Sequence, residues 1–218
     1  MGEMTMPGGW TMSTMWMRMP GQTWASAATS FLGMWIVMMM AMMLPVLIPM
    51  LSNVRPGRLT TIAAAGYFFV WTVVGIAAFP LGAGLAALEM QHPALARTVP
   101  MVAGVIVLIA GSFQFTARKA RYLACCREGS RRRTLAANPV AARRHGARLG
   151  LLCSRSCANL MTILLSVGLM DLRAMAVVTA AITFERLVPG GDERVARVVG
   201  AVAVGAGATA IAQAVGLG

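Results

Sequence analysis

Charged residues are scarce in this chain of 218 residues. They make up 12% of the sequence, whereas hydrophobic residues make up 58% and the mean hydropathy is +0.71. Soluble domains have roughly twice this share of charged residues. The composition therefore excludes a water-soluble domain, because a chain this apolar can bury its surface only against lipid. Aromatic residues are also few, at 6%, but glycine is plentiful, which suits closely packed transmembrane helices.

Motifs of several enzyme classes are missing as well. The sequence has no ATP-binding loop, no haem-attachment motif and no catalytic triad. A pump or a hydrolase is therefore not expected, and no enzymatic activity is predicted. We also expect no cleavable signal peptide, because the first apolar run begins only after Trp24 and is too long for the hydrophobic region of a signal.

Six apolar windows are long enough to cross a bilayer, whose hydrocarbon core of about 30 Å needs about 20 helical residues. The predicted fold is all-α, a polytopic membrane bundle of about six transmembrane helices over residues 26–218. The weaker segment Leu81–Ala96 is predicted to be a short interfacial helix or a loop. The windows are Ser26–Leu51, Thr60–Gly82, Val99–Thr116, Leu149–Met170, Leu172–Val188 and Val195–Leu217.

Basic residues are concentrated between the third and fourth windows. Ten of the nineteen Lys and Arg residues lie there, in a predicted Arg-rich loop at about residues 117–148. Positive residues favour the cytoplasmic side of a membrane. We therefore expect a bacterial inner-membrane protein with this loop in the cytoplasm and the N-terminus exported. The net charge of +12 marks the face beside anionic lipid, and without an aromatic-basic pattern it predicts no nucleic-acid partner.

Methionine is concentrated at the start of the chain, where 14 of its 19 copies lie within the first 50 residues. Thioethers are soft, uncharged ligands that select Cu(I) over zinc, calcium or magnesium. One group lies in a predicted exported tail, residues 1–25. The other recurs at intervals of four in the first window and so shares one helical face, with Met39 and Met43 on the adjoining row. The predicted ligands are Met12, Met15, Met17 and Met19 in the tail, and Met34, Met38 and Met42 in the helix.

Packing is the alternative role for these methionines, because the thioether side chain fills irregular gaps. Packing is favoured for the helical row taken alone. Metal binding is favoured for the tail, since an exposed, polar segment with glycine and proline has no core to fill.

The four cysteines form two pairs, Cys125 with Cys126 and Cys153 with Cys157. The second pair is spaced by four and so shares one helical face, near the predicted cytoplasmic start of the fourth window. Thiolates bind soft metals, and a reducing cytoplasm keeps such thiols free. The alternative is that they are small buried hydrophobic residues. The predicted thiol ligands are Cys126, Cys153 and Cys157.

Polar residues also interrupt the fourth window. Arg155 and Asn159 cannot face lipid without a large cost, so both are expected to point into the bundle. Glu185, near the inner end of the fifth window, is the expected partner of Arg155.

Several segments, in one order, resemble a known bacterial family. They are MWIVMMMAMMLPVLIPM, YFFVWTVVGIAAFP, FQFTARKARYLACCR, GARLGLLCSRSCANLMTILLSVGLMDLRAM and FERLVPGG. From about Trp24 to Val188 the chain resembles the domain-of-unknown-function family 2182, which is described as predicted metal-binding integral membrane proteins of bacteria. The resemblance implies a metal site that includes Cys126, Cys153 and Cys157. The chain departs from the family at Tyr122, where the family has a cysteine, and around Arg155, where it has a more cysteine-rich signature.

Three functions agree with these features. The first is metal handling, in which Cu(I) is bound, delivered or transported through thioethers and thiols, with an exported copper protein as a candidate partner. The second is an accessory subunit of a larger membrane complex, and the third is a membrane thiol oxidoreductase that uses Cys153 and Cys157. The third is disfavoured because the cysteines lie inward. Copper handling is the predicted function.

Overall fold

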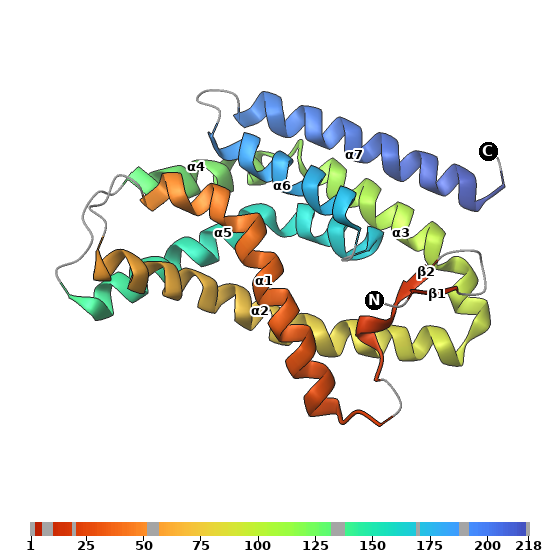
Figure 1. Ribbon diagram of the computed structural model, residues 1–218. Coiled ribbons are helices and arrows are strands. Elements are labelled where there is room, and N and C mark those ends of the chain that lie inside the picture. Colours follow the sequence, from red (N-terminus) through yellow and green to blue (C-terminus); the bar gives the residue numbers. More distant parts are fainter. Residues whose placement is uncertain are drawn as a thin grey trace.

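The structure is a computed structural model that describes residues 3–5, 11–18, 21–51, 57–131, 138–168, 171–187 and 192–216. Helices account for nearly all of these residues and lie against one another in one bundle (Figure 1). The predicted all-α fold is confirmed. The helices are α1 (Trp24–Leu51), α2 (Arg58–Gln91), α3 (Pro93–Phe113), α4 (Ala117–Arg131), α5 (Pro139–Val167), α6 (Leu172–Leu187) and α7 (Asp192–Ala214).

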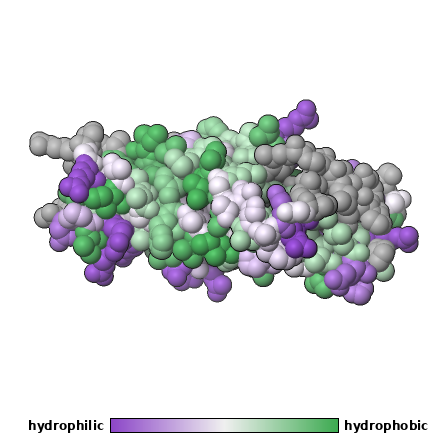
Figure 2. Space-filling model, turned by 60° about the horizontal axis from the view of Figure 1, so that its bottom comes forward, coloured by the Kyte–Doolittle hydropathy of each residue, from purple (hydrophilic) through white to green (hydrophobic). Residues whose placement is uncertain are grey.

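Five helices in the described chain, α1, α2, α3, α5 and α7, are long and apolar enough to cross a membrane. The remaining predicted window corresponds to α6, which has 16 residues. At 1.5 Å per residue it is about 24 Å long, which is shorter than a hydrocarbon core of roughly 30 Å. Large apolar side chains such as Val37, Phe69 and Ile109 are exposed. On the face drawn in Figure 2, apolar surface covers the middle and hydrophilic side chains gather mainly toward the two ends, as is compatible with a membrane protein.

Two segments that the sequence predicts as connections are helical. Residues 81–91 continue α2, which reaches Gln91, and α3 begins directly afterwards at Pro93. Proline suits the first turn of a helix because that turn lacks a partner for the missing N–H. The segment Leu81–Ala96 is therefore helical, but it does not form the separate short helix or the loop that was predicted, because its residues belong to α2 and to the start of α3. Because the hydropathy of this segment is weak, the sequence did not indicate that it extends α2 to a length of about 51 Å.

The predicted Arg-rich loop is also largely helical. It includes all of α4 and the first turns of α5, whereas residues 132–137 lie outside the described residues. The start of α5 is fixed by Asn138, whose side-chain oxygen accepts a hydrogen bond of 2.8 Å from Ala141 N, an N-cap that satisfies one of the unpaired donors of the first turn. A search for apolar windows misses these helical turns because their many charged residues lower the mean hydropathy.

Glycines bring α2 and α5 into close contact along their length. A Cβ atom added at Gly146 of α5 would overlap the carbonyl oxygen of Ala63, and one added at Gly66 of α2 would overlap that of Arg143. Small residues allow this approach of two helix backbones. The contact fixes how α5 is rotated against α2, and so which α5 side chains face the interior.

The N-terminal segment has structure that the sequence did not predict. Strands β1 (Glu3–Thr5) and β2 (Thr11–Ser13) pair antiparallel, and the short 3-10 helix η1 (Thr14–Trp16) follows. The Trp16 ring lies 5.1 Å from the ring of Phe31 in α1, measured between centroids. This part of the tail therefore packs on the first turns of α1 and does not extend freely.

Candidate metal site

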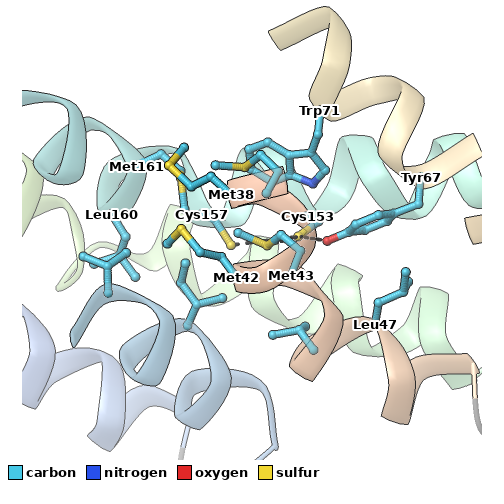
Figure 3. Close-up of a cluster of buried hydrophobic side chains, with 14 of the residues drawn as sticks. Met38, Met42, Met43, Leu47, Tyr67, Trp71, Cys153, Cys157, Leu160 and Met161 are labelled. Carbon is cyan, nitrogen blue, oxygen red and sulfur yellow. Dashed lines mark hydrogen bonds between the residues drawn. The ribbon is translucent and has the colours of Figure 1, made fainter. Parts of the chain in front are cut away.

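The centre of the bundle contains an unusual concentration of buried sulfur. Helix α1 supplies four methionines, and α5 supplies two cysteines and one methionine, all within one core cluster. Figure 3 shows Cys153 and Cys157 beside Met42 and Met43, with Met38 and Met161 next to them. We call these residues the sulfur cluster. Its members are Met38, Met39, Met42, Met43, Cys153, Cys157 and Met161.

The spacing of these residues along each helix explains how they meet. Met38 and Met42 are four apart, as are Met39 and Met43, so the four thioethers lie on one side of α1. Cys153, Cys157 and Met161 recur at the same interval on α5. The predicted helical face of Met38 and Met42 is therefore a buried face, and Met34 packs at its edge as a half-buried residue.

Cys153 Sγ lies close enough to two other sulfur atoms for each pair to share one ion. Cys153 Sγ is 4.0 Å from Cys157 Sγ and 4.0 Å from Met43 Sδ. Metal–thiolate bonds are about 2.3 Å long, so two sulfurs on one ion lie at most about 4.6 Å apart. All four cysteines of the chain are free, and Cys153 and Cys157 are buried. The donor set fits a soft monovalent ion.

Two polar side chains reach the thiols from other helices. Tyr67 of α2 donates a hydrogen bond from its hydroxyl to Cys153 Sγ at 2.8 Å. Arg186 of α6 donates from Nη2 to Cys157 Sγ at 3.2 Å. A cationic donor beside a thiol stabilises the thiolate, which is the form that binds metal. The site therefore has sulfur donor atoms and, at Cys157, a cationic group that favours the deprotonated thiol.

A network of buried polar groups lies on the other side of α5. Lys119 Nζ of α4 contacts Glu185 Oε2 at 2.8 Å and donates to the Ser156 carbonyl at 2.7 Å. Gln114 Nε2 donates to Glu185 Oε1 at 2.7 Å. Asn159 Nδ2 donates to the Ala110 carbonyl at 3.4 Å, so the prediction that Asn159 points inward is confirmed.

The prediction for Arg155 is wrong. Its side chain is exposed, and the partner of Glu185 is Lys119. The cause is the rotation of α5 about its axis. Arg155 is two residues from both Cys153 and Cys157, and two residues correspond to a turn of about 200°. When both cysteines face the interior, Arg155 must face outward.

The hydroxyl group of Ser156 lies between Cys126 and the sulfur cluster. Its Sγ atom lies 3.7 Å from Ser156 Oγ, and the same hydroxyl lies 3.9 Å from Cys157 Sγ. Cys126 is buried on α4, whereas the adjacent Cys125 is exposed. The third predicted thiol therefore borders the sulfur cluster without contacting it directly.

The two tail methionines whose side chains the structure describes, Met15 and Met17, do not belong to the sulfur cluster. Met15 packs at the edge of the main core, and Met17 packs against Ala86 and Ala96, both as half-buried residues. The side chain of Met12, in β2, and all of Met19 lie outside the described residues. Phe31, which contacts the tail, precedes Met43 by twelve residues of α1, a distance of about 18 Å. Packing therefore accounts for two of the tail methionines, and metal binding by the tail stays a prediction.

Five residues of the site were not among the predicted ligands. Met39, Met43 and Met161 had a signal in the sequence, because each lies in a four-residue spacing that was already visible. Arg186 had a weaker signal, as a charged residue near the end of an apolar window, and Tyr67 had none. The role of each depends on how α2 and α6 pack on α5. Within the described residues, no three or more His, Cys, Asp or Glu side chains converge to hold a metal.

A buried set of thiols and thioethers is typical of proteins that bind Cu(I). The chain matches the family model of the PpoB2 copper chaperones over residues 32–210. This match includes every described residue of the sulfur cluster and most of the chain, so the protein belongs to the PpoB2 copper chaperone family. The matched family is copper-related, in agreement with the predicted metal, and family 2182 stays an interpretation of the sequence motifs. Neither the curated proteins nor the solved structures gave a match.

Proposed function

We propose that this protein is a membrane-embedded copper chaperone that holds Cu(I) in its sulfur cluster. The central observation is that Cys153 Sγ lies 4.0 Å from both Cys157 Sγ and Met43 Sδ in the buried core. Soft sulfur ligands favour Cu(I), and neutral thioethers add donors without adding charge. Membership of a copper chaperone family supports the same cargo.

The electrostatics of the site favour a thiolate form that can accept the ion. An isolated thiolate in an apolar core is costly. Here the guanidinium of Arg186 and the hydroxyl of Tyr67 each donate to one of the two sulfurs. Both donors come from helices other than α1 and α5, so the thiols are stabilised in this way only when the whole bundle is assembled.

Placement in the membrane follows from the sequence and the apolar helices. We propose a bacterial inner-membrane protein with its N-terminal tail exported and α4 on the cytoplasmic side. In this orientation Met15 and Met17 lie toward the exported face, and Met34 and Met38 lie between them and the cysteines along α1. Copper collected by the tail from an exported copper protein would thus meet thioethers at intervals of one helical turn.

Competition titration against a Cu(I) chelator tests this function on purified protein. Wild type is compared with the double variant Cys153→Ser, Cys157→Ser. The matched control, Met40→Leu with Met101→Leu, removes two exposed sulfurs and keeps the cluster. We expect tight Cu(I) binding by wild type and control, with a shell of sulfur atoms in X-ray absorption, and loss of that binding in the cysteine variant. Equal binding by the wild type and the cysteine variant would contradict the proposal.

A further inference from the structure

Helix α4 has two faces of different character. One face packs on the bundle with Lys119, Leu123 and Cys126, which are all buried. The other is exposed and presents Arg118, Arg121 and Cys125, at intervals of three and four residues. These three residues therefore form one basic stripe that contains a free thiol. Nothing in the sulfur cluster uses Cys125.

The two faces are linked at consecutive residues. Cys126 directly follows Cys125 in the chain and approaches the hydroxyl of Ser156 at 3.7 Å. That hydroxyl also approaches Cys157 Sγ, at 3.9 Å. A series of side chains thus leads from Cys157, past the Ser156 hydroxyl, to Cys126 and then to its exposed neighbour in the chain, Cys125. Helix α4, beside the end of α1 in Figure 1, is where this series reaches the surface.

We propose that Cys125 is a transfer thiol, through which Cu(I) is exchanged between Cys126 and an acidic copper-binding protein on the α4 side. This proposal rests on the proposed function, because it needs Cu(I) in the sulfur cluster. It adds a site outside that cluster and a class of partner.

Each transfer is a ligand exchange in which the metal stays Cu(I). One copper–sulfur bond forms to the incoming thiol, and one breaks to the outgoing thiolate. The proton that leaves the incoming thiol is taken up by the outgoing sulfur, directly or through water. From Cys157 the ion passes to Cys126, then to Cys125, and finally to a soft ligand of the partner. No oxidant or reductant is needed.

The chemistry of the partner follows from the charge around Cys125. Exposed Arg118 and Arg121 attract an acidic surface and accelerate its encounter with the thiol, an effect that salt weakens. A second copy of this chain would place arginines against arginines. A charge-complementary protein with soft ligands therefore suits this stripe better than self-association.

The test measures how fast copper leaves the protein. Full-length protein loaded with Cu(I) is mixed with excess bathocuproine disulfonate, an anionic Cu(I) chelator, and the coloured complex is followed in time. Wild type is compared with Cys125→Ser and with Arg118→Gln combined with Arg121→Gln. We expect the serine variant to bind Cu(I) as tightly as wild type and to release it about tenfold more slowly. The glutamine variant should release it more slowly at low salt and lose the salt dependence.

The possible results separate the two proposals. If wild type holds no Cu(I) at all, the proposed function is wrong. If wild type holds Cu(I) and Cys125→Ser releases it at the same rate, the assignment of Cys125 as a transfer thiol is wrong and the proposed function stands. Weaker equilibrium binding by Cys125→Ser would also overturn this inference, because it would make Cys125 part of the holding site. An uncharged chelator, neocuproine, serves as the control, since its rate should not depend on the two arginines.

Discussion

On the face of α5 that meets α1 and α2, the side chains are Cys153, Cys157 and Met161. On the face that meets α3 and α4, they are Ser156 and Asn159. The first face therefore supplies soft sulfur donors, and the second supplies oxygen and nitrogen groups that bind Lys119 and the α3 backbone. The two kinds of side chain thus lie on different faces of one helix, and Arg186 contacts both faces.

The difference explains why the Glu185 carboxylate, which lies near the proposed copper site, is not expected to bind hard cations. Both oxygens of Glu185 are already engaged, Oε2 by Lys119 and Oε1 by Gln114. Hard cations need free oxygen ligands. The polar face therefore stabilises the packing of α3, α4, α5 and α6, and the sulfur face is left to select the metal. Variants on the two faces should separate stability from copper binding.

The largest effect on stability is expected from Lys119→Met. The change leaves Glu185 buried without its cation, and breaking a buried ion pair from one side typically costs about 3–5 kcal/mol. Thermal unfolding in detergent should show a large drop in the free energy of unfolding, and Cu(I) stoichiometry at low temperature should be nearly unchanged. Adding Glu185→Gln should restore much of the stability. A double variant that is no more stable than Lys119→Met would show that the pair does not act as a unit.

The next largest effect is expected at the contact between α2 and α5, which supports both faces. In Gly146→Ala the added methyl group would overlap the carbonyl oxygen of Ala63, and overpacking of this kind costs about 1–3 kcal/mol. The matched control is Gly33→Ala in α1, where an added Cβ meets nothing within 4 Å. There the helix should gain about 0.5–1 kcal/mol. Equal unfolding temperatures for the two variants would contradict this role of the helix contact.

The sequence predicted part of this arrangement, for identifiable reasons. Hydropathy located α1, α3, α5 and α7, because an apolar run of about 20 residues with few charges has the length and composition of a membrane span. Intervals of four residues placed Met38 with Met42 and Cys153 with Cys157, because the helical repeat is fixed. The window Leu172–Val188 matches the bounds of α6 to within one residue, but a helix of 16 residues is shorter than a membrane span, and composition alone does not distinguish the two.

What the sequence could not supply is which helices meet. The tail and the inner thiols were predicted as two separate groups of ligands, whereas the α1 methionines meet the α5 cysteines directly. That meeting depends on packing, for example at Gly146, and no spacing within one helix determines it. The partner of Glu185 was assigned to Arg155 for the same reason. Lys119 was expected near Glu185 as well, but it could be chosen over Arg155 only after α4 was placed against α5.

Substitutions of methionines inside and outside the sulfur cluster should differ in their effect on Cu(I) binding. Met42→Leu with Met43→Leu removes two donors and keeps the apolar volume, and such exchanges usually cost less than about 1.5 kcal/mol in stability. We expect the Kd for Cu(I) to rise by about 10- to 100-fold. Loss of an outer-shell partner of a metal typically has an effect of this size, and loss of direct donors should weaken binding at least as much.

The comparison variant changes Met12, Met15, Met17 and Met19 to leucine. It should leave the buried site intact and remove only Cu(I) bound at the tail, so the number of ions per protein falls while the tightest Kd is unchanged. If the tail variant and the cluster variant weaken the tightest site equally, the assignment of that site to the bundle is wrong.

The smallest predicted effect concerns Tyr67, which touches the sulfur face without being a ligand. Its hydroxyl donates to Cys153 Sγ at 2.8 Å. Tyr67→Phe keeps the ring and removes this one bond, which is worth about 0.5–1.5 kcal/mol. If the bond is stronger to the thiolate than to the thiol, the Kd for Cu(I) should rise by roughly 3- to 10-fold.

The chain offers a matched control, because its only other tyrosine is Tyr122, on α4. Tyr122→Phe should leave Cu(I) affinity unchanged. A role in positioning also predicts a readout other than affinity: the rate at which the free protein reacts with a thiol reagent should change at Cys153 in Tyr67→Phe and not in Tyr122→Phe. A structural role alone would lower the unfolding temperature of Tyr67→Phe and leave both affinity and thiol reactivity as they are, and that result would remove Tyr67 from the site.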